Sequence, residues 1–155
     1  MYRPILAAFL LLATVAAQSS SIGIEIPPIP AGCQSHESSM LGPTHKFAYS
    51  FLVCDGEYVV LLQKFVDLRG RNVVWVVLDE LHVAINGSAR ELLGVPICES
   101  AYHKGEFIFG LGELKELVSS YEAVNISNAW RFNLENGKIE AIGTNGMSCT
   151  LDKVD

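Results

Sequence analysis

The chain has 155 residues, of which 50% are hydrophobic, and its 17 Asp and Glu against 11 Lys and Arg give a formal net charge of −6. This length corresponds to one domain that can bury a core of ordinary size. Nucleic acids and anionic membranes are bound through clustered Lys and Arg, so the acidic balance excludes nucleic acid and favours a cationic partner.

The first seventeen residues predict a secretory signal peptide. Arg3 supplies the positive charge, residues 5–15 form an apolar stretch, and Val15-Ala16-Ala17 is a cleavage site of small residues. The apolar stretch is too short for a membrane anchor, and no later stretch is long enough to span a bilayer. We therefore expect an exported protein without membrane insertion after cleavage, periplasmic if the source is bacterial and otherwise extracellular.

The four cysteines all lie beyond the predicted cleavage site, at Cys33, Cys54, Cys98 and Cys149. An even number of cysteines in an exported chain predicts two disulfides, for which three pairings are possible. We favour Cys33–Cys54 and Cys98–Cys149, because each bond then ties a loose segment to a predicted strand or strand end. The wide spacing contains no C-x-x-C pair, which disfavours a zinc site or a thiol redox site.

Residues 18–43 are predicted to form an extended arm followed by a loop. Residues 22–26 alternate apolar with polar or glycine residues, which suits an edge strand or an extended arm, and the prolines of 27–30 impose a spacer. Residues 35–43 are rich in Ser, Gly and Pro and indicate a loop. The globular domain is then expected to cover residues 44–155.

The start of this domain predicts an antiparallel meander. Residues 47–54, 58–68 and 73–85 have the composition of strands, and short turns connect them. The continuous apolar centres of the second and third strands indicate burial on both faces.

Two segments of the second half predict helix. Ser88-Ala89-Arg90-Glu91 has the form of a capping box, which predicts one or two helical turns over residues 89–93. Leu111, Leu114 and Leu117 recur at helical spacing, which predicts a helix over residues 111–121 with its leucines facing the core.

The last third predicts short strands. The alternation in residues 130–134, the Asn136-Gly137 pair and the apolar residues of 138–142 indicate a hairpin with a primed turn. Further strands are expected at residues 95–98, 106–109, 121–126 and 147–151. The predicted class is mainly β, or α+β: a single antiparallel sheet or sandwich of about seven strands with one helix, stabilised by disulfides.

His82 is the strongest candidate for a catalytic base. On a strand it shares a face with Glu80, and such a pair can hold a base near neutral pH. No serine of the chain lies in a Gly-x-Ser-x-Gly motif, so a solvated strand end is the preferred interpretation. A small secreted hydrolase that uses His82 and Glu80 stays as an alternative.

A metal site is not expected. His36, Glu37, Met40 and His45 cluster near Cys33, but their spacing matches no ligand template and Cys33 is expected to be oxidised. We therefore predict no metal and no cofactor.

The Gly-rich loops are the preferred binding segments, because functional residues on a disulfide-tied framework commonly lie in such loops. They comprise Asn86, Gly87 and Ser88 in one loop and Thr144, Asn145, Gly146, Met147 and Ser148 in the other.

Size, export, disulfides, acidity and the lack of a catalytic motif together indicate a binding protein rather than an enzyme. The main hypothesis is an inhibitor or immunity-type protein that occludes a secreted or periplasmic hydrolase or toxin. Enzymes that degrade anionic cell walls are often cationic, which suits an acidic inhibitor. A second alternative is an envelope or extracellular interaction component whose residues 22–26 add as a strand to a partner sheet.

Overall fold

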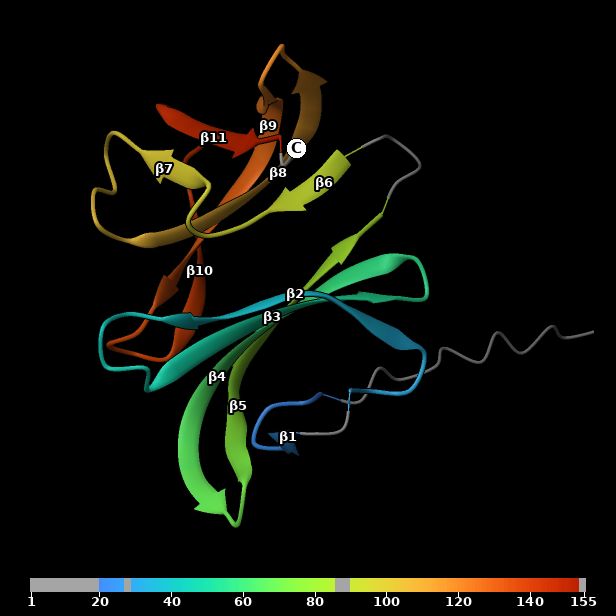
Figure 1. The fold of residues 1–155 in the computed structure, drawn as a ribbon, viewed down its shortest axis with the longest axis vertical. Coiled ribbons are helices and arrows are strands. Elements are labelled where there is room, and N and C mark those ends of the chain that lie inside the picture. Colours follow the sequence, from blue (N-terminus) through green and yellow to red (C-terminus); the bar gives the residue numbers. More distant parts are fainter. Residues whose placement is uncertain (1–19, 27–28, 86–89, 154–155) are drawn as a thin grey trace, which may run out of the picture.

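The computed structural model describes residues 20–26, 29–85 and 90–153, and over these ranges the chain forms strands and no helix (Figure 1). The strands make two antiparallel sheets that pack against each other. The mainly β prediction is therefore confirmed, with two sheets and no helix. The predicted signal peptide, residues 1–17, lies outside the described residues.

Five strands in the order β1-β5-β4-β3-β2 form the first sheet. They are β1 (Glu25–Ile26), β2 (Cys33–Leu41), β3 (Phe47–Cys54), β4 (Glu57–Arg69) and β5 (Asn72–Ala84). The predicted meander is confirmed as β3, β4 and β5, which pair consecutively. The tight β3–β4 turn consists of Asp55 and Gly56, both at positive φ, as a primed hairpin turn requires.

Strand β2 corrects the loop predicted for residues 35–43. It pairs with β3 along its length, with a register shift between Ser35 and Glu37. Because β2 is the last strand of its sheet, most of its side chains are exposed, and polar residues are tolerated there. The Ser-rich composition that indicated a loop is therefore that of an edge strand.

The second sheet has six strands: β6 (Arg90–Leu93), β7 (Cys98–Ser100), β8 (Phe107–Glu116), β9 (Ser120–Asn133), β10 (Lys138–Ile142) and β11 (Met147–Asp152). Its order is β6-β8-β9-β11-β7, and β10 also pairs with β9. One edge of the long strand β9 is shared, because β10 pairs with residues 129–133 and β11 with residues 120–122.

The helix predicted over residues 111–121 is wrong. Residues up to Glu116 belong to β8, Leu117 and Val118 lie in the turn, and β9 begins at Ser120. Both faces of β8 carry buried side chains, since Leu111 packs between the sheets and Leu114 packs on the opposite face. In a strand that is buried on both faces, apolar residues need not alternate with polar ones. The three-residue spacing of Leu111, Leu114 and Leu117 then resembles the spacing of a helix.

The capping-box helix over residues 89–93 is also wrong, because Arg90–Leu93 is strand β6, paired with β8. The hairpin of residues 130–142 is confirmed, since β9 pairs with β10 from Asn133 and Lys138 onward. Its turn differs from the prediction. Gly137 has φ 68° but Asn136 is not at positive φ, so the connection is a four-residue loop and not a type I′ turn.

An aromatic core joins the two sheets. It consists of Leu41, Tyr49, Phe51, Tyr58, Val60 and Leu62 from the first sheet and Leu92, Phe109, Leu111, Trp130 and Phe132 from the second. Val59 and Leu61 are also buried, on the opposite face of β4. The predicted burial of β4 on both faces is therefore confirmed.

The two disulfides are Cys33–Cys54 and Cys98–Cys149, which confirms the favoured pairing. Each belongs to a cluster on the outer face of one sheet: Cys33 and Cys54 lie with Leu52, and Cys98 and Cys149 lie with Ile108. Structural disulfides indicate an oxidising environment, such as the extracellular space or a periplasm.

Tyr49 links β3 to β2 and to the second sheet. Its hydroxyl hydrogen-bonds to the Glu37 carboxylate on β2 and lies 2.9 Å from the Val95 carbonyl oxygen. Burial raises the pKa of Tyr49, and the hydrogen bond to Glu37 and the charge of that carboxylate raise it further.

Tyr49 makes stability sensitive to alkali. The pKa of Tyr49 in the folded protein lies above the usual tyrosine value of about 10. Its contribution to the free energy of unfolding is therefore complete below about pH 10, and it declines at higher pH because Tyr49 then ionises in the unfolded chain but not in the folded protein. We expect the free energy of unfolding to fall above about pH 10 and the fall to be shallower in Tyr49→Phe. Urea unfolding at several alkaline pH values measures this slope, and an equal slope in both proteins would contradict it.

Removal of Cys98–Cys149 is expected to destabilise more than removal of Cys33–Cys54, because the bonds span 51 and 21 residues respectively. Each double alanine variant should lose about 2–5 kcal/mol in the free energy of unfolding. Urea denaturation of both variants tests the order, and a greater loss without Cys33–Cys54 would contradict the loop-entropy explanation.

Candidate functional site

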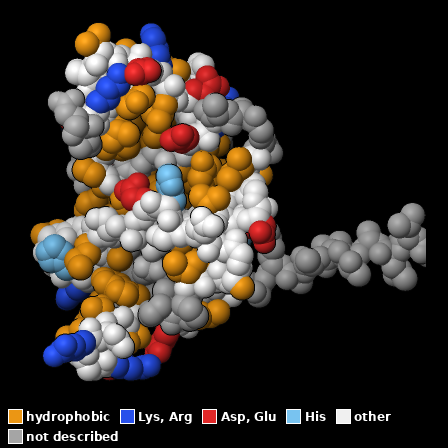
Figure 2. Space-filling model, turned by 45° about the vertical axis from the view of Figure 1, so that its right-hand side comes forward, with side chains coloured by type: hydrophobic (Ala, Val, Ile, Leu, Met, Phe, Trp, Pro, Cys, Tyr) orange, Lys and Arg blue, Asp and Glu red, His pale blue; other side chains and the backbone are white. Residues whose placement is uncertain are grey.

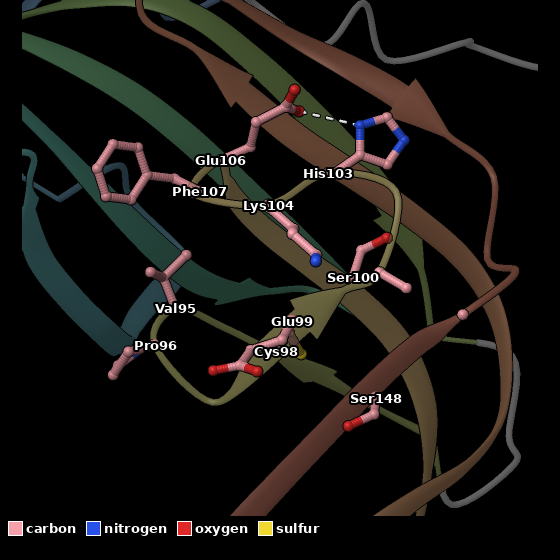
Figure 3. A pocket seen from close by; sticks show the side chains of 13 residues that line it. Val95, Pro96, Cys98, Glu99, Ser100, His103, Lys104, Glu106, Phe107 and Ser148 are labelled. Carbon is pink, nitrogen blue, oxygen red and sulfur yellow. Dashed lines mark hydrogen bonds and ion pairs between the residues drawn. The ribbon is translucent and has the colours of Figure 1, made fainter.

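A cavity of about 650 Å³ lies beside the second sheet. Strand β7, the loop of residues 101–106 and the turn before β11 surround it (Figure 3). Its lining comprises Val95, Pro96, Cys98, Glu99, Ser100, Ala101, His103, Lys104, Gly105, Glu106, Phe107, Gly146 and Ser148.

The floor of the cavity is held by the pairing of β7 with β11. Cys98 lies opposite Cys149 in this pair, and the disulfide joins them. Beneath β11, Met147 packs against β8, where a Cβ on Gly110 would lie 2.7 Å from the Met147 methyl carbon. A side chain at position 110 would therefore require the Met147 side chain to move.

The rim of the cavity consists of the loop of residues 101–106 and the turn that contains Gly146, and one backbone hydrogen bond connects the two. The Ala101 amide donates to the Gly146 carbonyl oxygen at 3.0 Å, and the Met147 amide donates to the Thr144 carbonyl oxygen at 3.2 Å. Ser100 accepts a hydrogen bond from the Tyr102 amide at 3.2 Å. The Ala101–Gly146 bond thus joins the two segments, and the other two bonds order each segment internally.

An ion-pair network fixes the other side of the rim. Arg131 on β9 donates to both oxygens of Glu106 at 3.0 Å and to Glu140 on β10 at 2.7 Å. The Glu106 carboxylate also lies 3.1 Å from Nδ1 of His103. Hydrogen bonds to Glu140 and then to Glu106 raise the pKa of Arg131, and hydrogen bonds from Asn136 and then from Arg131 lower the pKa of Glu140.

The cavity combines an apolar side with polar groups. In Figure 3, Phe107, Val95 and Pro96 lie on one side, Ser100 and Ser148 on the other, and Lys104 extends between them. His103 bonds to Glu106, and no described hydroxyl group hydrogen-bonds to its ring. The described residues therefore place no serine–histidine pair in the cavity, and the arrangement suits recognition of another molecule.

The predicted loop of residues 144–148 contributes to this cavity in part. Gly146 and Ser148 line it, whereas the side chain of Met147 packs into the outer cluster of the second sheet. The other predicted binding residues, Asn86, Gly87 and Ser88, lie outside the described residues.

The sequence reasoning missed the loop of residues 101–106. Its most prominent side chain is Tyr102, which is 76% exposed. The signal was an aromatic residue followed by His103 and Lys104 in a segment without regular alternation. An exposed aromatic side chain on a fixed loop is a common anchor in protein interfaces.

The pair His82 and Glu80 is present but lies apart from the cavity. Nδ1 of His82 is 3.0 Å from Glu57 on β4, and Nε2 is 3.9 Å from Glu80. In the described part of the chain no hydroxyl group hydrogen-bonds to this ring. The group is a cluster of one histidine and two carboxylates on the sheet, without a nucleophile beside the base.

The candidate metal ligands near Cys33 are spread along β2. Cys33 itself is bonded to Cys54, and His36, Glu37 and Met40 lie in the strand. Over the described ranges, no group of three or more His, Cys, Asp or Glu is placed to hold a metal ion.

The segment of residues 22–26 is already part of a sheet. Glu25 and Ile26 pair with β5, the Gly23 amide donates to the Val77 carbonyl oxygen, and the Val77 amide donates to the Ile24 carbonyl oxygen. Because β1 is the last strand of its sheet in the described residues, only one of its edges pairs with β5, and its addition to a partner sheet stays a prediction.

Comparison of the chain with protein families, with curated proteins and with solved structures finds no match. In the residues that the structure describes, no helix is long and apolar enough to cross a membrane. The function of the cavity therefore has to follow from its geometry.

Glu106 is expected to keep the rim loop closed. Glu106→Gln removes the charge that pairs with Arg131 and His103, so trypsin should cleave after the exposed Lys104 several times faster. Because exposed ion pairs contribute about 0–1 kcal/mol, the thermal midpoint should change little. Glu99→Gln, on the same cavity but outside the network, is the matched control. Equal cleavage rates in the two variants would show that the network does not fix the loop.

Proposed function

We propose that this is an exported binding protein of the inhibitor or immunity type. It occludes a cationic hydrolase or toxin in the periplasm or extracellular space, with a cell-wall-degrading enzyme as the preferred target. The cavity and its rim are the proposed contact surface, and the protein itself performs no chemistry.

The observation that carries this proposal is the fixed rim. The Cys98–Cys149 bond, the Ala101–Gly146 hydrogen bond and the Arg131–Glu106 ion pair hold its segments from three directions. Loops that are already ordered lose less conformational entropy when a partner binds, so more of the contact energy becomes affinity. Tyr102, whose ring lies next to Gly146 of the cavity lining, supplies an exposed aromatic anchor.

Charge supports a cationic partner. The chain has a formal net charge of −6, which accelerates encounter with a positively charged protein at low ionic strength. The cavity also offers its own acidic group, because Glu99 lines it and takes part in no ion pair within the described residues. Binding is therefore expected to weaken as salt increases.

Affinity capture with rim variants tests the proposal. The natural envelope fraction or culture fluid is passed over the immobilised protein at low and at moderate salt, and the retained protein is assayed for hydrolase activity. Tyr102→Ala removes the anchor, and Ser148→Trp fills the cavity from an exposed position. Both should lower capture about tenfold or more, in the range of interface anchors.

Arg71→Gln, in the β4–β5 turn of the first sheet, is the matched control and should retain the partner. Recovery of no protein at either salt concentration would contradict the proposed function. Equal capture by the wild type, Tyr102→Ala and Ser148→Trp would show that another surface binds the partner.

A further inference from the structure

The β4–β5 hairpin projects from the first sheet. Strand β3 ends its pairing with β4 at Lys64, whereas β4 and β5 continue to pair as far as Arg69 and Asn72. In Figure 1 this hairpin forms the lower end of the molecule, whereas β7 and the loop that lines the cavity lie on the flank of the upper half. Its tip therefore reaches a surface that the cavity does not touch.

The projecting part exposes apolar side chains on one face. Phe65 pairs with Trp75 and Leu68 pairs with Val73, so the four residues share one face of the hairpin. Leu68 is 60% and Val73 is 40% exposed, and the rings of Phe65 and Trp75 meet edge to face at 6.0 Å between centroids. Val66, at a register shift of β4, is a further exposed aliphatic residue, at 51%.

Basic residues lie at the tip and at the base of the hairpin, and Lys64, which pairs with Phe47 and Val76, is on the face opposite Phe65 and Trp75. Residues 64–71 contain Lys64, Arg69 and Arg71 against the single acid Asp67. Arg69 pairs with Glu25, whereas Lys64 and Arg71 make no ion pair in the part of the chain that the structure describes. Figure 2 shows Lys and Arg side chains around hydrophobic ones at the lower end of the molecule. Residues 64–71 together with Glu25 thus keep a small net positive charge in an otherwise acidic chain.

We propose that the β4–β5 hairpin docks the protein on a surface of anionic phospholipid. Leu68 and Val73 enter the boundary between headgroups and acyl chains, Trp75 lies at headgroup level, and Arg71 at the tip binds lipid phosphate. Aromatic and long basic side chains are favoured at this depth because their apolar parts are buried while their polar ends stay hydrated. Because the tip projects beyond the rest of the first sheet, it can contact a flat lipid surface.

Charge also orients the protein. An anionic surface attracts the hairpin and repels the rest of the acidic chain, so the upper half of the molecule, which carries the cavity, is held away from the lipid. The net charge alone argued against an anionic membrane. Near the hairpin the charge distribution differs from the net charge, because the meander places Lys46 beside β4. The Phe65 amide donates to the Lys46 carbonyl oxygen at 2.9 Å.

Vesicle co-sedimentation tests the proposal. The protein should bind vesicles of equimolar phosphatidylglycerol and phosphatidylcholine, should not bind phosphatidylcholine alone, and should dissociate as salt increases. Arg71→Gln should weaken partition about fivefold, the effect of one basic residue near such a surface. Leu68→Ser should weaken it about tenfold through the loss of apolar burial.

The matched control is Val118→Ser. Val118 is 99% exposed in the β8–β9 turn, outside the hairpin, so its replacement should leave partition unchanged. A second measurement is tryptophan fluorescence: Trp75 is half-buried and should shift to the blue on binding, whereas Trp130 is already buried in the core.

Absence of vesicle binding, or equal binding to both lipid mixtures, would overturn the proposal. So would an equal loss in Val118→Ser and Leu68→Ser. If Leu68→Ser abolished capture of a protein while vesicle binding was absent in the wild type, the hairpin would be a protein-binding element instead. None of these outcomes depends on the rim variants, so the lipid proposal and the proposed function fail separately.

Discussion

The aromatic core between the sheets is the constraint on which the rest of the structure depends. The ring of Phe109 lies 5.3 Å from Phe51, 5.4 Å from Trp130 and 4.7 Å from Phe132, and Tyr49 lies 5.4 Å from Phe132. These contacts join β3 to β8 and β9 across the two sheets. Such aromatic pairs contribute about 0.5–1.5 kcal/mol each beyond the area they bury, and they fix the orientation of the sheets. The packing of the sheets thereby keeps the cavity beside the second sheet separate from the β4–β5 hairpin of the first sheet.

Beside the second sheet, pairing across strands distant in sequence produces the rim of the cavity. Its parts come from β7, the following loop and the turn before β11, and each part is tied by a different kind of bond. In the first sheet, β4 and β5 extend beyond their neighbours and expose a face that would be buried nearer the middle of the sheet. Asp79 on β5 further joins the sheets, because it accepts hydrogen bonds from the Ile139 amide and from Lys138 at 2.8 and 3.3 Å.

The features predicted correctly from the sequence are those with local causes. The meander was predicted from three apolar segments that short turns connect. The disulfide pairing was predicted because each bond ties a loose segment to a predicted strand or strand end. The helix at 111–121 failed because burial of β8 on both faces removed the alternation by which a strand is recognised. Strand β2 was missed because an edge strand needs no apolar face. For the candidate site, Gly146 and Ser148 were predicted from loop composition, whereas Tyr102 and the Arg131–Glu106 pair depend on contacts between segments far apart in the chain.

The central claim is that the rim of the cavity is ordered before any partner binds, and amide hydrogen exchange in the native protein measures this most directly. The Ala101 and Met147 amides donate to carbonyl oxygens within the rim, so they should exchange much more slowly than in an unfolded chain, in the manner of the strand amides of β7 and β11. Exchange of both amides at the unfolded rate would show that the rim opens freely, and a preorganised binding surface would then be contradicted.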